Sequence, residues 1–260
     1  MPDDVGKLHS LGSNDEWRWA RLRVAARIAL ATHLLAGLAM ATILRHGLET
    51  NPVLEDRVRF MADHVVLWRV AWLSWSMAAV SILYFFASFI AAHATPLADP
   101  AGGRGLILML AVVAVATDLT AEAIEIGVAP GLAQQAVTEM AGTGASQSAA
   151  TLFVAFHRTS VMLSGFLANG LYSVVALALS VVGRRQYPKW VSWAGVGVGV
   201  AGILLSVACL LDSVGGMVWS NVALVPLLLV WLAGVGMHPS TGELGGMNRV
   251  AQSDPRRALR

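Results

Sequence analysis

The sequence predicts an all-α integral membrane bundle of six transmembrane helices with both termini cytoplasmic. Of the 260 residues, 56% are hydrophobic and only 13% are charged, about half the ~25% charge typical of soluble domains. Long apolar runs recur along the chain, each near the ~20 residues that a bilayer span needs. The 18 basic and 16 acidic residues nearly balance, and no stretch concentrates the basic ones, so we expect no nucleic-acid partner.

The apolar runs divide the chain into three parts. Residues 28–237 are expected to form one membrane domain, between a basic cytoplasmic N-terminal tail at 1–27 and a cytoplasmic C-terminal tail at 238–260. The 27 residues before the first span are long for a secretory leader, which favours an uncleaved first span. Proline and glycine separate the spans, for example at Pro130-Gly131. The predicted spans lie near 28–44, 66–92, 105–128, 155–183, 190–212 and 218–237.

Lysine and arginine set the predicted orientation, because short loops rich in these residues stay on the cytoplasmic side. Most of them fall on one side of the predicted bundle: Lys7, Arg18, Arg21, Arg23, Arg27, Arg104, Arg184, Arg185, Lys189, Arg249, Arg256, Arg257 and Arg260. The opposite side carries few, chiefly Arg45, Arg57 and Arg59. Both termini are therefore expected in the cytoplasm.

Tryptophans mark the predicted span edges, where their amphipathic rings favour the headgroup layer. Trp68, Trp72 and Trp75 follow one another at i, i+4 and i+7, which places the three rings on one helical face. Anchoring at the membrane surface is the main interpretation, and the aromatic wall of a pocket is the alternative. The intervening segment 45–66 mixes apolar and charged positions and is expected to form an amphipathic helix at the outer surface, as a lid or a connector.

Three acidic residues fall inside the third predicted span. Asp118, Glu122 and Glu125 share one helical face and rise over roughly 10 Å. Each would cost on the order of 2.5–3.5 kcal/mol if it faced lipid, so the face must look into the bundle or a water-filled cavity. Like charges one turn apart disfavour joint ionisation, so at least one carboxyl is expected to hold a proton at neutral pH. Structural pairing with arginines is the competing interpretation.

Other predicted spans bring polar side chains to the same, outer half of the membrane: His64, Arg69, His157, Arg158, Asp212 and Asn221. The sequence therefore predicts a polar cavity open to the outer side. Arg158 is the expected partner of Glu122 or Glu125, and Asn169 continues the polar face deeper along the fourth span.

Several sequence motifs indicate helix packing and not a catalytic, cofactor or metal site. Gly197-Val198-Gly199-Val200-Ala201-Gly202 matches the dinucleotide pattern but lies inside an apolar run, so close helix packing explains it better. Cys209, the single cysteine, is expected to behave as a buried hydrophobe. The seven histidines show no ligand spacing, and neither a metal site nor a cofactor is predicted.

The chain resembles a bacterial family of multi-spanning membrane proteins that is known only as a domain of unknown function. The resemblance covers roughly residues 20–237 and rests on Asp118, Glu122, Glu125, His157 and the segment Tyr187-Pro188-Lys189-Trp190 leading into Trp193-Ala194-Gly195. It implies an all-helical bundle in the bacterial plasma (inner) membrane and carries no assigned activity.

These features predict a multi-pass protein whose outward-facing cavity binds a small hydrophobic or amphiphilic, lipid-like ligand, with membrane lipids as its other partners. The candidate acid/base residues are Asp118, Glu122 and Glu125. The candidate ligand-binding residues are Arg69, His157, Arg158, Asn169, Asp212, Trp68, Trp72 and Trp75. An acid-catalysed isomerase or cyclase of a terpenoid or sterol-like substrate and a proton-coupled transporter are the two alternatives. Enzyme activity and oligomeric state stay open.

Overall fold

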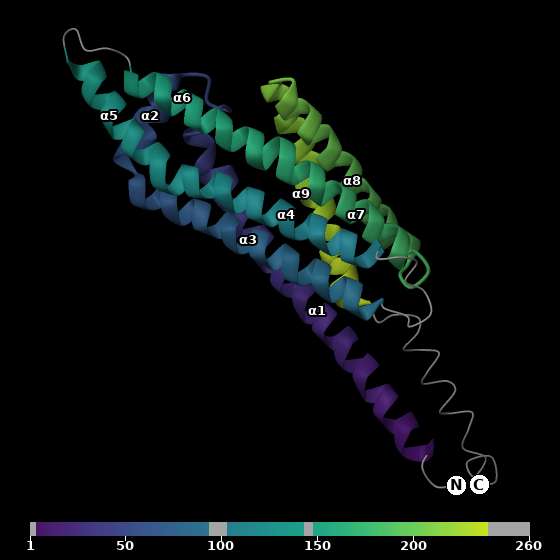
Figure 1. Cartoon of the computed structure of the whole chain (residues 1–260). Helices are drawn as coiled ribbons and strands as arrows, with labels where there is room; N and C mark the ends of the chain where they lie inside the picture. Colours follow the sequence, from purple (N-terminus) through teal and green to yellow (C-terminus); the bar gives the residue numbers. More distant parts are fainter. Residues whose placement is uncertain (1–3, 94–102, 143–147, 239–260) are drawn as a thin grey trace.

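The computed structural model is all-α (Figure 1) and describes residues 4–93, 103–142 and 148–238, with side chains from Glu16 onward. Its elements in chain order are α1 (Asp4–Thr42), η1 (Leu44–His46), α2 (Leu54–Asp63), α3 (Val65–Ala92), α4 (Gly103–Ala123), η2 (Ile124–Val128), α5 (Ala129–Ala141), α6 (Ser148–Val161), η3 (Met162–Ala168), α7 (Asn169–Gly183), α8 (Lys189–Leu210) and α9 (Val214–Met237). The Lys7 side chain and all of the C-terminal tail beyond His238 lie outside the described residues.

Six helices in the described part of the chain are long and apolar enough to cross a membrane, which confirms the predicted fold class. They are Glu16–His46, Val65–Ala92, Gly103–Ala141, Ser148–Gly183, Lys189–Leu210 and Val214–Met237. The protein is therefore a multi-span helical membrane protein. The cytoplasmic placement of the termini stays a prediction.

The six spans pack in a ring in the order α1, α3, α4, α7, α8 and α9, and α9 closes the ring against α1. The Arg27 guanidinium donates a hydrogen bond to the Gly236 carbonyl at 3.4 Å, so the middle of α1 and the last turn of α9 lie at the same end of the bundle. We call this the terminal end. The opposite end, formed by residues 44–63 with α5 and α6, is the distal end.

Aromatic residues fill the terminal half of the ring. Phe85 meets Trp231 edge to face at 5.3 Å between ring centroids, and Phe89 packs beside them. All three side chains are at most 1% exposed. Since lipid is as apolar as this core, close packing and not the hydrophobic effect must hold the helices together here.

Glycines let α8 approach its neighbours, which confirms the helix-packing interpretation of the Gly-rich run. A Cβ atom at Gly195 would lie 2.9 Å from the Trp231 ring, and one at Gly202 would lie 2.1 Å from Ser173 Oγ. Such distances leave no room for a side chain. The Gly-rich run therefore holds α8 in close contact with α7 and α9.

His93 lies immediately after α3 among aromatic rings, stacked on Phe89 at 4.0 Å and edge to face with Trp19 at 4.9 Å. Burial lowers the pKa of His93 to about 4. In the unfolded chain the His93 imidazole takes up a proton below about pH 6.5, whereas in the folded protein it does so only near pH 4. Between these two pH values the unfolded state therefore binds more protons than the folded state. The free energy of unfolding is therefore expected to be highest above about pH 6.5 and to fall toward pH 4, by up to about 1.4 kcal/mol per pH unit. Thermal unfolding of the wild type and of His93→Phe in detergent, at several pH values, checks this prediction. The stability of the variant should depend less on pH, and an equal dependence in both proteins would contradict the role of His93.

The third and fourth spans are much longer than a bilayer requires. Gly103–Ala141 and Ser148–Gly183 contain 39 and 36 residues, which is about 58 and 54 Å of helix against a hydrocarbon core of ~30 Å. The break predicted at Pro130-Gly131 is wrong, because the helix continues through it and ends at Ala141. Figure 1 shows the two helices running side by side into the α5–α6 hairpin, which projects at the distal end.

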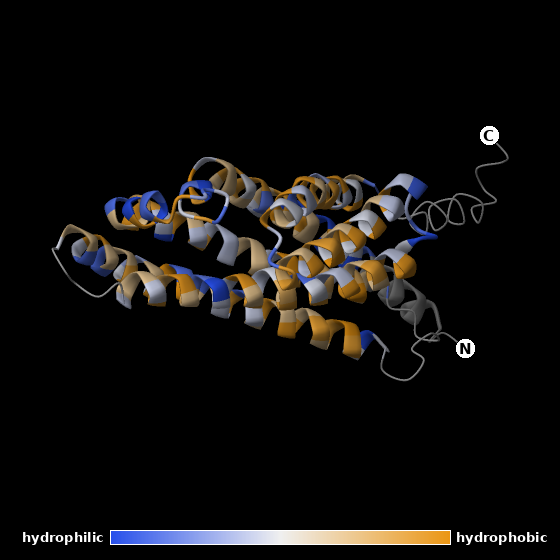
Figure 2. Ribbon diagram, turned by 90° about the horizontal axis from the view of Figure 1, so that it is seen from above, coloured by the Kyte–Doolittle hydropathy of each residue, from blue (hydrophilic) through white to orange (hydrophobic). Residues whose placement is uncertain are grey.

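The distal end has its own small core. The predicted amphipathic helix forms as α2, and its Val58 and Met61 are fully buried. They cluster with Ala133 and Ala136 of α5 and with Phe153 of α6. The small alanines allow α2 to lie close on the hairpin. Figure 2 shows hydrophilic residues at this end and at the opposite helix ends, while apolar residues cover most of the spans.

Candidate functional site

The three acidic residues of the third span are buried between helices. Asp118 and Glu122 lie in α4 and Glu125 in η2, and their exposed fractions are 9%, 2% and 0%. Their face of the helix packs against α3 and against the fourth span. The structure therefore turns the acidic face into the bundle, as the cost of exposing carboxyls to lipid requires.

Asp118 is held by hydroxyl groups. Ser164 donates to Oδ1 at 2.6 Å and Tyr172 donates to Oδ2 at 3.2 Å. Ser164 lies in η3, a wide helical turn that approaches α4. One turn further along, the Ser76 hydroxyl lies beside the Glu122 carboxyl, and Glu122 Oε2 has no hydrogen-bond partner among the described residues.

Glu125 forms a buried pair with His157. Glu125 Oε1 lies 2.7 Å from His157 Nδ1, and the two side chains are 1% and 2% exposed. A proton must lie between atoms at this distance. Glu125 Oε2 and His157 Nε2 have no partner in the described part of the chain. The His157 ring is parallel to Phe153, with 6.0 Å between centroids.

A proline explains the backbone geometry at Glu125. Pro130 has no N–H, so it donates neither to the Ile126 carbonyl, as in an α-helix, nor to the Glu125 carbonyl, as in the wider turn of η2. Two α3 side chains supply the missing donors. Trp68 Nε1 donates to the Glu125 carbonyl at 2.9 Å, and Arg69 Nε donates to the Ile126 carbonyl at 3.0 Å. The wide turn, the proline and the two α3 donors thus fix the position of the Glu125 side chain along the third span.

Replacing Trp68 with phenylalanine is expected to destabilise the protein by about 1–2 kcal/mol, because it leaves the Glu125 carbonyl buried without its donor. Trp72→Phe is the matched control, since Trp72 Nε1 is buried without a partner and its loss removes no hydrogen bond. Unfolding free energies of both variants in mixed detergent micelles check this. Equal losses would contradict the role assigned to Trp68.

A cleft of about 520 Å³ opens at the distal end. Its walls come from the segment before α2, from α2 itself, from α6 and from the turn between α8 and α9. The lining residues are Glu49, Thr50, Asn51, Pro52, Arg57, Arg158, Asp212 and Val214. The predicted polar cavity thus has a counterpart, but the buried carboxyls lie behind its wall and do not line it.

The α8–α9 turn aims Asp212 at Arg158. Asp212 has φ of 58°, a left-handed conformation that ends helices and that aspartate tolerates. Ser213 then caps α9 by accepting from the Gly216 N–H at 3.2 Å. The Arg158 guanidinium forms an ion pair with Asp212 and lies 4.0 Å from Glu49. The expected pairing of Arg158 with Glu122 or Glu125 is wrong, because His157, one residue earlier, is the side chain that faces Glu125.

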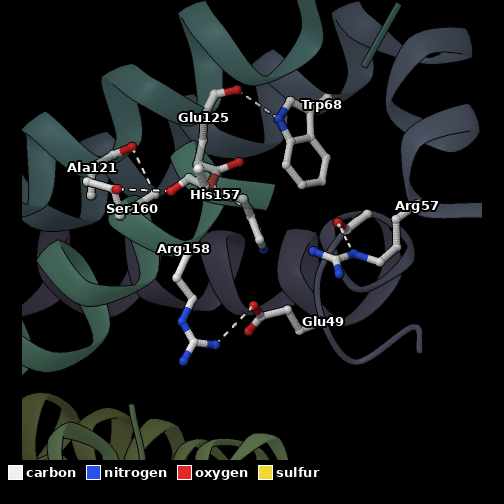
Figure 3. Close-up of polar contacts among 11 residues, drawn as sticks. Glu49, Arg57, Trp68, Ala121, Glu125, His157, Arg158 and Ser160 are labelled. Atoms are coloured by element: carbon white, nitrogen blue, oxygen red, sulfur yellow. Dashed lines mark hydrogen bonds and ion pairs between the residues drawn. The ribbon is translucent and has the colours of Figure 1, made fainter. Parts of the chain in front are cut away.

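Arg57 is a cleft residue that the sequence analysis did not single out. It is 9% exposed, and its Nε donates to the Gly47 carbonyl at 3.2 Å. Gly47 is required there, since a Cβ would lie 2.6 Å from the Trp68 ring. The guanidinium lies 6.0 Å from the centroid of the Phe153 ring, and among the described residues no carboxylate lies within 4 Å of it. Figure 3 shows Arg57, Arg158 and Glu49 on one side of His157, and Glu125 and Trp68 on the other.

The remaining predicted residues are dispersed. Trp68 is fully buried, so the anchoring interpretation is wrong for it, whereas Trp193 and Trp219 are more than 70% exposed at span ends. Asn169 donates to the Ser164 carbonyl at 2.9 Å and therefore stabilises the wide turn η3. Within the described residues, no three His, Cys, Asp or Glu side chains lie together as a metal site would need.

No protein-family model matches the chain, and no curated protein or solved structure matches it at a significant level. The resemblance inferred from the sequence is therefore supported only at the level of its class. The fold and the site define a multi-span helical membrane protein with a few charged residues buried between its spans.

Proposed function

We propose that the protein binds a small or lipid-like ligand with an anionic head group in the distal cleft. The observation that carries this proposal is the charge at the cleft floor. Arg158 is neutralised by Asp212, but Arg57 is bonded only to a carbonyl within the described contacts and is nearly buried. A guanidinium in that position favours a carboxylate, sulfate or phosphate as its partner.

The size and place of the cleft fit such a ligand. A volume of about 520 Å³ falls in the range of small-molecule sites. Glu125, which lies behind the cleft wall, is 22 residues after Gly103 along the third span, about 33 Å of helix. This length is close to the ~30 Å of a hydrocarbon core and supports a cleft near the level where lipid head groups meet water. A ligand there can keep an apolar tail in the bilayer and its head group in the cleft.

The test compares two arginines on α2. Arg57 lines the cleft, whereas Arg59 is exposed and pairs with Glu55 at 2.6 Å. Small molecules and lipids that co-purify with the wild-type protein are identified by mass spectrometry and quantified in Arg57→Gln and Arg59→Gln. We expect an anionic compound that Arg57→Gln loses at least about tenfold and that Arg59→Gln retains. Equal retention by folded Arg57→Gln would overturn the proposal.

Acid catalysis on an apolar substrate is the second candidate, favoured by one observation. Glu122 is 2% exposed and keeps one carboxyl oxygen without a partner in the described structure, an environment that suits a proton-donating carboxyl. Accumulation of an unconverted lipid precursor in cells carrying Glu122→Gln would favour this function. A changed set of bound compounds without such accumulation would favour ligand binding.

A further inference from the structure

The distal cleft and the buried Glu125–His157 pair are linked by a short stack of side chains. The Arg57 guanidinium lies over Phe153, Phe153 is parallel to His157, and His157 meets Glu125. Each of the first two steps spans 6.0 Å, so Arg57 lies within about 12 Å of the imidazole. At this distance the charge of Arg57 acts on the imidazole through the protein interior.

The pair has two protonation states with different net charge. With one proton, the neutral imidazole donates through Nδ1 to the Glu125 carboxylate, and the pair carries −1. A second proton, taken from water, binds at Nε2, the ring atom without a partner, and the pair becomes a neutral imidazolium–carboxylate. Arg57 favours the first state by attraction, and an anion bound to Arg57 would cancel that preference.

Other charged groups lie on the helices that pack around the pair. Arg69 of α3 lies outside the cleft and is bonded to the Ile126 carbonyl. Arg158 is occupied by Asp212. The charged and titratable groups on these elements and in the cleft include Glu49, Arg57, His64, Arg69, Asp118, Glu122, Glu139 and Arg158. Of the cationic groups, Arg57 both lines the cleft and stacks toward His157. Burial lowers the pKa of Arg57, and the charges of Glu49 and Glu125 oppose that shift.

We infer that binding of an anionic head group at Arg57 is coupled to the uptake of a proton by the Glu125–His157 pair. The inference rests on the proposed function. One charge acting over this distance changes the proton affinity of the pair about tenfold at an effective dielectric constant of about 20. By linkage, the ligand binds about tenfold more tightly at low pH than at high pH.

Titration calorimetry with hexyl sulfate tests the coupling, because this anion keeps its charge across the whole pH range used. Measurements in buffers with different heats of ionisation count the protons taken up per ligand bound. For the wild-type protein in nanodiscs we expect uptake of up to about half a proton per ligand at the pH of greatest uptake, and a Kd that falls by up to about tenfold as the pH is lowered.

Matched variants identify where the proton goes. Glu125→Gln/His157→Gln removes both titratable groups and should bind hexyl sulfate with no proton uptake. Glu55→Gln, which changes an exposed acid outside the cleft, should behave as wild type. Uptake that persists in the double variant and disappears in Glu49→Gln or Asp212→Asn would place the proton on a cleft acid and overturn the inference. Should the double variant not fold, wild-type uptake that survives in both Glu49→Gln and Asp212→Asn supports the pair, and uptake that is lost in either variant overturns the inference.

The outcomes separate the two proposals. Hexyl sulfate binding to wild type with no proton uptake at any pH would overturn the coupling and leave the proposed function standing. No binding to wild type would overturn anion binding in the cleft, and the coupling with it.

Discussion

Replacing His157 with leucine is expected to lower the free energy of unfolding by about 3 kcal/mol. The substitution keeps a side chain of similar size beside Phe153 but leaves the Glu125 carboxyl, which is fully buried, without the partner that lies 2.7 Å away. Removing one member of a buried pair typically costs about 3–5 kcal/mol, whereas replacing both members with apolar residues of similar volume is often neutral. Glu125→Met/His157→Leu should therefore recover most of the loss.

The adjacent residue supplies the control. Arg158 forms a partly exposed ion pair with Asp212, and such pairs contribute about 0–1 kcal/mol. Arg158→Met should therefore cost much less than His157→Leu. Unfolding by SDS in mixed micelles measures all four proteins. A double variant no more stable than His157→Leu would show that the pair is held by its surroundings and not by its own bond.

Replacing Gly199 with alanine is expected to have the second-largest effect, a loss of about 1–3 kcal/mol. The new Cβ would lie 2.4 Å from Leu177 Cγ and 3.0 Å from the Ser173 carbonyl oxygen. The leucine side chain can turn away, but the carbonyl belongs to the backbone of α7. Helices α7 and α8 would have to separate.

Gly131 is the matched control for Gly199. It lies inside α5, and a Cβ there would meet nothing within 4 Å, so Gly131→Ala should raise stability by about 0.5–1 kcal/mol through helix propensity. Thermal melting of the two variants in one detergent compares them directly. A destabilising Gly131→Ala, or a neutral Gly199→Ala, would contradict this account of the glycines.

The sequence predicts the spans well because hydropathy alone determines where a chain can cross a membrane. Val65–Ala92 and Lys189–Leu210 match the expected runs closely. The fourth span begins at Ser148, seven residues earlier than expected, and the third ends at Ala141, 13 residues later than expected. The reason is Pro130. A proline usually ends a helix because its missing N–H leaves a carbonyl unpaired. Here Trp68 and Arg69, over 60 residues away in sequence, supply the donors, and no local pattern reveals that.

The sequence predicts that polar residues of the candidate site lie near one another, but not which of them pair. The polar residues were expected at one end, and Glu125, His157, Arg158 and Asp212 do lie there. His157 and Arg158 differ by 100° around the helix, however, and hydropathy does not choose which of them faces Glu125. Arg57 was missed because the segment around it has the composition of an exposed connector. The apolar Val58 and Met61, spaced to face one side, were the available signal that α2 packs on the protein.

The two donors at Pro130 also limit how the molecule can move. A slide of α3 along α4 by one turn, ~5.4 Å, would separate Trp68 and Arg69 from the carbonyls they bind and leave both unpaired in an apolar setting. These two hydrogen bonds therefore oppose any sliding of α3 along α4. The opposite wall of the cleft belongs to the α8–α9 turn. Among the described residues, no hydrogen bond of this kind joins that turn to α3. Movement of this turn away from α6 would break the Arg158–Asp212 ion pair and widen the cleft.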